Sequence, residues 1–242
     1  MIKFFRKIRQ KLLSENKFSK YLLYAVGEIV LVVIGILIAL QINNLNEGKK
    51  SQVLEQKLLR ELKVDLNQNI ADFEINIQIR KNALQVQNTL LEVMAQKRPY
   101  NDSLSSFFYY GRFLNISTLN VRHGAYDAIQ STGLTFITND SIRNSLTEFY
   151  TEEMESIRTA ESREDKMLDI LIPFILEELE SDPMNGLATP VDFESLTSNK
   201  RFKQSITVYS YFQRGIIARY TKAVEMAKSL IEKIEVDLNE TK

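Results

Sequence analysis

The feature that most constrains this chain is a long apolar run near its N-terminus. From Leu22 to Ile42 the only ionisable residue is Glu28. As an α-helix, which rises about 1.5 Å per residue, this run would be roughly 31 Å long. The hydrocarbon core of a bilayer is about 30 Å thick. We therefore expect residues 21–44 to form a transmembrane helix surrounded by the lipid bilayer.

The charges that flank this run predict its orientation. Residues 1–20 hold seven cations and one anion. Cations next to a span tend to stay in the cytoplasm, so we expect a single-pass signal anchor in the cytoplasmic (inner) membrane, with the N-terminus in the cytoplasm and the body in the periplasm. A cleaved signal peptide is the alternative, but the run is longer than a typical signal core and Ala39, Leu40 and Gln41 make a poor cleavage site.

The basic tail, residues 1–20, has a helical pattern of its own. Phe5, Ile8 and Leu12 follow helical spacing, and basic residues lie between them. One interpretation is a short amphipathic helix on an anionic membrane surface. The other is that the cations only set the topology. The candidate membrane-surface residues are Lys3, Arg6, Lys7, Arg9 and Lys11.

One face of the expected span combines small residues with the carboxylate of Glu28. Small residues let a second helix approach closely, and a polar side chain can hydrogen-bond across such a contact. We expect this face to contact another transmembrane helix, from a second copy or from an unknown membrane protein. Alternatively, Glu28 lies about 10 Å from the cytoplasmic edge and is protonated or reaches the headgroups. The face is formed by Ala25, Glu28, Val32, Gly35 and Ala39.

The stretch FFRKIRQKLLSENKFSKYLLYAVGEIVLVVIGILIALQINNLNE, residues 4–47, resembles the start of an uncharacterised family of single-span membrane proteins common in Bacteroidetes. The likeness lies in the basic tail, the Gly27-Glu28 pair and the ALQINN exit; Leu45 stands where many members have tryptophan. IQSTGLTFITNDSIRNSLTEFY, residues 129–150, resembles the family's Ser-Gly turn before a long helix. The resemblance implies this topology and architecture, and it implies no activity.

Beyond the span, the periodicity of apolar residues is helical. In the first segment apolar residues recur at seven, as in a coiled coil, although Arg80 and Gln87 interrupt a second row. A segment from about 140 to 180 has Asn139 or Asp140 as its cap and Pro173 inside, which should kink or split it. The clearest face is in the last segment and comprises Tyr209, Phe212, Ile216, Tyr220, Ala223, Ala227, Leu230, Ile234 and Leu238.

Shorter elements are expected between these long segments. Two short helices are predicted near 102–114 and 121–132, the second ending at Gly133, and residues 134–138 are the best candidate for a strand. One isolated strand cannot make a sheet. The predicted fold class is therefore all-α: one N-terminal transmembrane helix followed by an elongated antiparallel helical bundle. The expected domains are a tail at 1–20, a span at 21–44 and a bundle at 45–242.

No catalytic or metal-binding motif stands out. The chain has no cysteine, which excludes disulfides and thiol catalysis, and three residues before its one histidine, His123, stands Asn120 and not glutamate. A His123–Asp127 pair could act as a base, but a local polar contact is the favoured interpretation. The part after residue 42 holds 24 cations and 29 anions, which argues against nucleic acid. We expect no enzyme activity, metal or cofactor.

An aromatic run offers one candidate site. Four consecutive aromatic residues at 107–110 cover more than one side of a helix, so some of them could line a pocket or a contact patch. Burial beneath the longer helices is the favoured alternative. The candidate residues are Phe107, Phe108, Tyr110, Phe113 and His123.

Two functions follow from this organisation. The first is a membrane-anchored helical scaffold or accessory subunit without catalysis. The alternative is an extracytoplasmic ligand-sensing module, which would need a membrane partner because only about twenty residues remain in the cytoplasm. A pocket near 107–113 and His123 would favour sensing, and a long exposed apolar strip would favour a scaffold.

Overall fold

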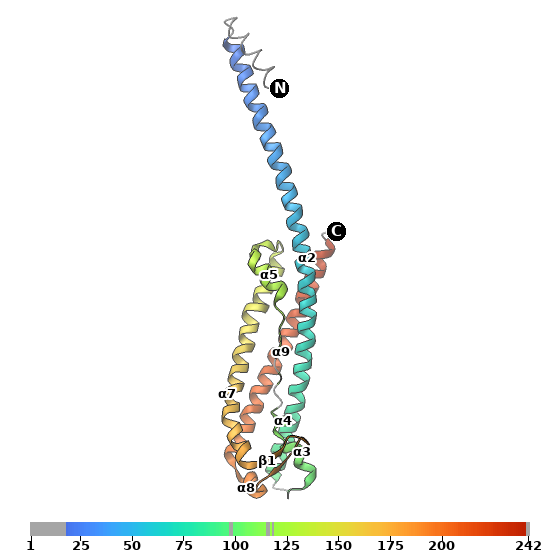
Figure 1. Ribbon diagram of the computed structural model, residues 1–242, viewed down its shortest axis with the longest axis vertical. Coiled ribbons are helices and arrows are strands. Elements are labelled where there is room, and N and C mark those ends of the chain that lie inside the picture. Colours follow the sequence, from blue (N-terminus) through green and yellow to red (C-terminus); the bar gives the residue numbers. More distant parts are fainter. Residues whose placement is uncertain (1–17, 97–98, 115–116, 118, 241–242) are drawn as a thin grey trace. The chain divides into compact units, whose positions relative to one another are not determined.

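The computed structural model describes residues 18–96, 99–114, 117 and 119–240. The chain divides into two units, Met1–Glu55 and Gln56–Lys242. Within the described residues both units are helical, and the one sheet has two strands (Figure 1). The predicted all-α class, with an apolar N-terminal helix and an elongated helical body, is confirmed.

The expected span lies in α2 (Phe18–Gln96). Every residue from 29 to 54 is exposed, including the apolar ones. Among the described residues, α2 is the one helix that is long and apolar enough to cross a membrane.

Two further long helices build the body together with the second part of α2. These are α7 (Met154–Glu178) and α9 (Lys200–Glu240), and α9 runs antiparallel to both of the others (Figure 1). α9 buries a residue at every third or fourth position, as the spacing of its apolar residues predicts. Its large buried side chains are Phe202, Ile206, Tyr209, Gln213, Ile216, Tyr220, Leu230 and Ile234.

Short elements connect α2 to α7. η1 (Asp102–Leu104), α3 (Ser105–Phe108) and α4 (Tyr110–Phe113) replace the single helix expected near 102–114. The helix is broken at Tyr109, whose backbone is extended with φ −66° and ψ 117°. α5 (Gly124–Thr132) ends as predicted at Gly133, whose φ of 103° suits a residue without a Cβ.

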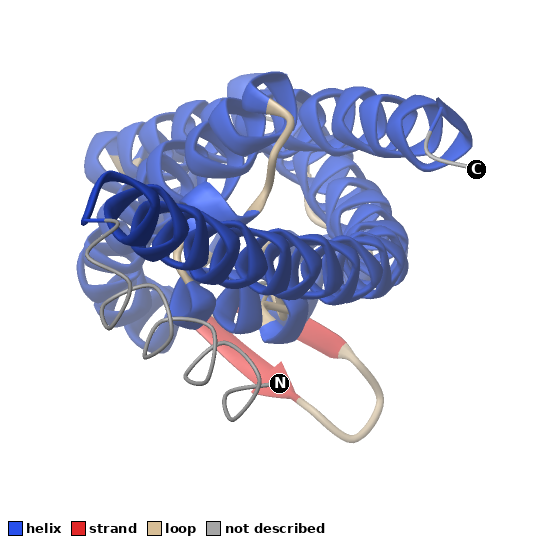
Figure 2. Cartoon of the chain, turned by 90° about the horizontal axis from the view of Figure 1, so that it is seen from above, coloured by secondary structure: helices blue, strands red, loops and turns tan. Residues whose placement is uncertain are grey.

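Residues 134–138, the best candidate for a strand in the sequence, do not form one. η2 (Leu134–Phe136) is a 3-10 turn there, and the backbone N–H groups of Phe136 and Ile137 donate to carbonyls three residues back. These local bonds satisfy groups that an isolated strand would leave without partners. The strands are instead β1 (Leu179–Asp182) and β2 (Leu187–Pro190), an antiparallel hairpin at the edge of the body (Figure 2).

The segment from 140 to 180 is interrupted, but not at its proline. α6 (Asp140–Thr147) is capped by Asn139, as predicted, and is followed by the π-helical η3 (Glu148–Glu153). The wider turn of a π-helix allows two consecutive aromatic residues, Phe149 and Tyr150, to be buried. α7 continues through Pro173 to Glu178, so the proline does not split it.

The body contains two hydrophobic cores, at opposite ends of it (Figure 1). The α5-side core lies beneath α5, α6 and η3. The hairpin-side core lies beneath α3, α4, α8 (Phe193–Ser198) and the hairpin. Buried residues of the first include Phe73, Ile142, Phe149, Ile216 and Tyr220, and those of the second include Leu90, Phe113, Leu171, Phe202 and Tyr209.

Candidate functional site

A buried ion pair separates the two cores. The Nη1 atom of Arg80 in α2 donates to Oε1 and Oε2 of Glu164 in α7, at 2.8 and 2.7 Å. It also donates to Oε1 of Gln213 in α9 at 3.1 Å. Both charged side chains are only 1% exposed. Along each helix the polar residue lies between residues of the α5-side core and residues of the hairpin-side core.

Burial and pairing act against each other on the pKa of both partners, and burial prevails at Glu164. Removal from water raises the pKa of Glu164, and the guanidinium of Arg80 offsets part of that rise. The guanidinium also lies over the ring of Tyr220, 5.4 Å from its centroid. Because both charges are buried, a shift of one helix along the others would leave a charge without its partner, which is costly.

A second polar contact holds the end of α4 in position. Nε2 of Gln87 donates to the carbonyl of Phe113 at 2.6 Å, and the hydroxyl of Ser210 donates to Oε1 of Gln87 at 2.6 Å. The hydroxyl of Tyr209 donates to the carbonyl of Leu114 at 3.2 Å. α2 and α9 therefore both anchor residues 113–114. In the sequence, Gln87 and Arg80 were visible only as interruptions of an apolar row.

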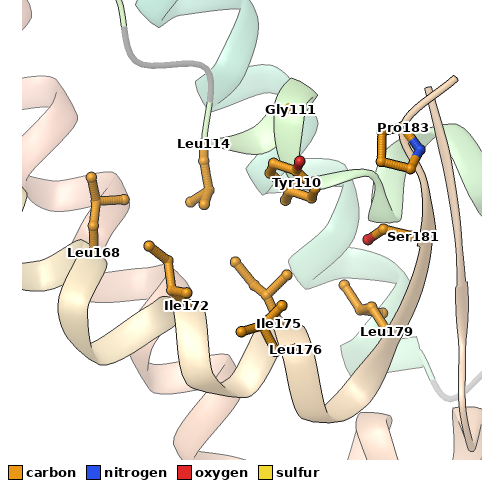
Figure 3. A pocket seen from close by; sticks show the side chains of 10 residues that line it. All are labelled: Tyr110, Gly111, Leu114, Leu168, Ile172, Ile175, Leu176, Leu179, Ser181 and Pro183. Carbon is orange, nitrogen blue, oxygen red and sulfur yellow. The ribbon is translucent and has the colours of Figure 1, made fainter.

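Beside this anchor point lies an open cavity of about 650 Å³. It lies between α4, the C-terminal part of α7 and the start of the hairpin (Figure 3). Its volume is in the range of about 300 to 1,000 Å³ that is usual for small-molecule sites. The lining consists of Tyr110, Gly111, Leu114, Leu168, Ile172, Ile175, Leu176, Leu179, Ser181 and Pro183.

The cavity wall is mostly aliphatic. Ile175 and Leu179 are buried, whereas Ile172 is 43% and Leu176 is 77% exposed, so aliphatic groups also face solvent. Among the described residues of the wall, the polar side chains are those of Tyr110 and Ser181, which carry hydroxyls, and none is an acid, an amine or a guanidinium. Such a wall suits a ligand that buries apolar surface.

The structure separates the aromatic residues predicted to form a site. Phe108 and Phe113 are fully buried in the hairpin-side core, and Phe107 is partly buried. Tyr110 is 38% exposed and lines the cavity. Two of these residues, Phe108 and Phe113, are therefore buried beneath longer elements, and one, Tyr110, lies in the cavity wall.

His123 lies elsewhere, at the other end of the body. It precedes α5, and its ring lies 5.8 Å from that of Tyr150. It lines a smaller cavity of about 230 Å³ together with Asn120, Arg158 and Glu161. Among the described residues no three or more His, Asp or Glu side chains are arranged to hold a metal ion.

Three side chains on one face of α2 hold the segment that carries His123. Asp72 accepts from the backbone N–H of Asn120 at 2.9 Å, and Asp65 accepts from that of Ala125 at 2.9 Å. Between them, Asn69 accepts from the N–H of Arg122 at 2.7 Å and donates to its carbonyl at 3.1 Å. The face of α2 thus binds an irregular segment by its backbone, which is a structural role.

The residues predicted for the membrane lie in α2 or before it. Val32, Gly35 and Ala39 are exposed, and Ala25 and Glu28 are partly buried. A Cβ added at Gly35 would meet no atom of the chain within 4 Å. The basic candidates Lys3, Arg6, Lys7, Arg9 and Lys11 lie outside the described residues.

A sequence profile described as "Family of unknown function (DUF6090)" matches residues 28–170. The matched range contains Arg80, Tyr110 and Glu164, and it ends within α7, before the last part of the cavity wall. Neither a curated protein nor a solved structure matches the chain.

Proposed function

We propose, from the premise that this chain belongs to the Family of unknown function (DUF6090), that it is a membrane-anchored ligand-binding protein. Its body would bind a small apolar ligand in the cavity beside α4 and α7. The observation that supports this most directly is the open aliphatic cavity of about 650 Å³. The cavity lies beside the aromatic run, because Tyr110, Gly111 and Leu114 line it. A pocket at this place favours the ligand-sensing function over the scaffold.

Anchoring by α2 is part of the proposal. The apolar segment would cross the cytoplasmic membrane once as a signal anchor, with the basic tail in the cytoplasm and the body in the periplasm. Its support is the apolar stretch in α2 and the seven cations that precede it. On this proposal a response to ligand would pass through this segment to another transmembrane helix.

The proposed role is binding and not catalysis. The carboxylates of Asp65 and Asp72 near His123 accept hydrogen bonds from backbone N–H groups, and the histidine ring packs beside Tyr150. Both contacts suit a structural role. The buried Arg80–Glu164 pair lies inside the bundle, where its charges bind each other.

The second candidate is the scaffold or accessory subunit. Its support is the exposed face of α2 that combines the small residues Gly35 and Ala39 with the carboxylate of Glu28, where another helix could approach closely. On this proposal the face of Ala25, Glu28, Val32, Gly35 and Ala39 contacts a partner helix in the membrane.

Native mass spectrometry of the full chain in lipid nanodiscs tests ligand binding. Wild-type protein should retain a small apolar molecule from its cells. Ile172→Trp, which fills the cavity from its mouth, should lose it, and Ile170→Trp should keep it because Ile170 is 51% exposed on the same helix but outside the cavity wall. If Ile172→Trp retains the molecule as well as wild type does, the cavity is not its site.

Crosslinking in native membranes tests the second candidate. A partner membrane protein or a second copy should be captured by wild type and lost with Glu28→Leu or Gly35→Leu. Gly27→Leu is the matched control, because it makes the same change outside that face. Recovery of the same products from all the variants would argue against a docking face.

A further inference from the structure

We infer that the ligand of the cavity is an uncharged amphiphile with a single aliphatic chain. This inference rests on the proposed ligand binding and adds the chemical class of the ligand. Three properties of the described wall support it: the kind of apolar side chain, the position of the two hydroxyls and the lack of a charged side chain.

The apolar part of the wall is aliphatic. It is made by leucine and isoleucine side chains of α7, including Leu168, Ile172 and Ile175, and by Leu114 from across the cavity (Figure 3). Flat aromatic ligands usually stack on aromatic side chains, and the one aromatic ring of the lining is that of Tyr110. An alkyl chain gains most from such a wall, because it buries apolar area without needing a specific ring geometry.

The two hydroxyl-bearing side chains lie toward one end of the cavity. Tyr110 and Ser181 lie on the side of Pro183, and Leu168, Ile172 and Leu114 lie on the other side (Figure 3). Each hydroxyl can both donate and accept a hydrogen bond. The cavity therefore has a polar end for a head group and an aliphatic end for a chain.

The wall offers a charged head group no ionic partner. Among the described residues that line the cavity, none carries a carboxylate, an amine or a guanidinium. A carboxylate or an ammonium would therefore lose its water without gaining an opposite charge. A hydroxyl, amide or ester head group avoids this cost and can pair with the two hydroxyls.

Photolabelling of the full chain in lipid nanodiscs tests this inference. Three analogues share an alkyl chain with a diazirine and differ only in the head group: an alcohol, a carboxylate and a quaternary ammonium. The labelled peptides are mapped by mass spectrometry. The alcohol should label residues 168–183 most strongly, and the two charged analogues should label them at least several-fold less.

Matched variants locate the labelling. Ile172→Trp should lower it at least tenfold, and Ile170→Trp should leave it unchanged. Tyr110→Phe and Ser181→Ala should each lower labelling by the alcohol several-fold, and Tyr211→Phe should not, because Tyr211 is 72% exposed on α9 away from the cavity. Affinity should rise roughly fourfold per added methylene while the chain still fits.

The outcomes separate the two proposals. Equal or stronger labelling of 168–183 by either charged analogue would overturn the uncharged head group and leave ligand binding intact. If no analogue labels this segment above the level seen with Ile172→Trp, both proposals are wrong. An octyl alcohol delivered from water and a hexadecyl alcohol held in the bilayer distinguish a soluble ligand from a membrane lipid, and site-specific labelling by either one supports the inference.

Discussion

The two ends of the body are built on the same helices but closed differently. Both cores use α2 and α9, yet the cavities beside the α5-side core, of about 510 and 230 Å³, are lined partly by charged side chains. The hairpin-side core is equally well buried at its centre but opens into a cavity of about 650 Å³. The difference lies in the elements that cover each end, and not in the long helices.

Length and continuity of the covering elements explain this contrast. α5, α6 and η3 supply helical turns that bury Ile129, Ile142 and Phe149 against the long helices. At the other end, α3 and α4 have four residues each and the hairpin is a two-stranded ribbon. Such short pieces cannot present a continuous apolar face, so they leave space between them. A binding site is compatible with stability here because the polar layer of Arg80, Glu164 and Gln213 and the α5-side core lie elsewhere in the body.

The largest expected effect comes from breaking the layer between the two cores. Arg80→Met leaves the carboxylate of Glu164 buried without its partner and should lower the free energy of unfolding by about 3 to 5 kcal/mol. The double variant Arg80→Met/Glu164→Leu should recover much of this loss, and Lys81→Met, at an exposed neighbour, should change little. Denaturant unfolding of the full chain in nanodiscs, followed by circular dichroism, measures all three. A single variant as stable as wild type would show that the ion pair does not support the body.

The next prediction compares the two cores through one substitution in each. Ile142→Ala removes a side chain that is 0% exposed in the α5-side core, and Ile175→Ala removes one that is 4% exposed on the cavity wall. We expect the free energy of unfolding to fall by about 3 to 4 kcal/mol for Ile142→Ala and by about 2 kcal/mol for Ile175→Ala. The second loss is smaller because that substitution enlarges a space that already exists. The same unfolding assay measures both. Equal losses would mean that the cavity wall is packed as tightly as the α5-side core.

Alkaline pH should weaken both sides of the polar layer. Burial raises the pKa of Tyr209 in the hairpin-side core and of Tyr220 in the α5-side core above the ordinary 10.0. The unfolded chain then ionises at lower pH than the folded one, so these groups stabilise the body fully below pH 10 and progressively less above it. Above pH 10 the free energy of unfolding should fall by about 1.4 kcal/mol per pH unit for each phenol. Absorbance titration of tyrosinate, compared with Tyr209→Phe and Tyr220→Phe, checks this; ionisation at the ordinary pKa in the folded state would contradict it.

The smallest effect on stability is expected at the cavity mouth. Leu176→Ser changes a side chain that is 77% exposed, so the free energy of unfolding should change by no more than about 0.5 kcal/mol. Retention of an apolar ligand should nevertheless fall, because the mouth loses aliphatic surface. Unfolding and ligand retention are measured on the same preparation, with Val236→Ser, at a residue 57% exposed on α9, as the control. A large loss of stability would mean that Leu176 is part of the core.

Some of this molecule could be predicted from local sequence alone. The apolar segment of α2, the apolar face of α9, the Asn139 cap and the Gly133 terminus all follow from the properties of neighbouring residues. Within the aromatic run, Tyr110 lies in the cavity wall, whereas Phe108 and Phe113 are core residues, and the sequence did not distinguish them. Helix phase depends on short-range spacing, and this is why such predictions succeed.

The contacts between distant residues of the body could not be predicted from local sequence. Arg80 and Glu164 are 84 residues apart, and Gln87 and Ser210 are 123 apart, so no local pattern could pair them. The hairpin and the π-helical turn likewise depend on what each segment packs against, and both were missed by periodicity. Local sequence was enough to predict the long helices and their apolar faces, because both depend on near neighbours. Which faces meet, and where a space is left between them, depends on long-range packing of the whole body.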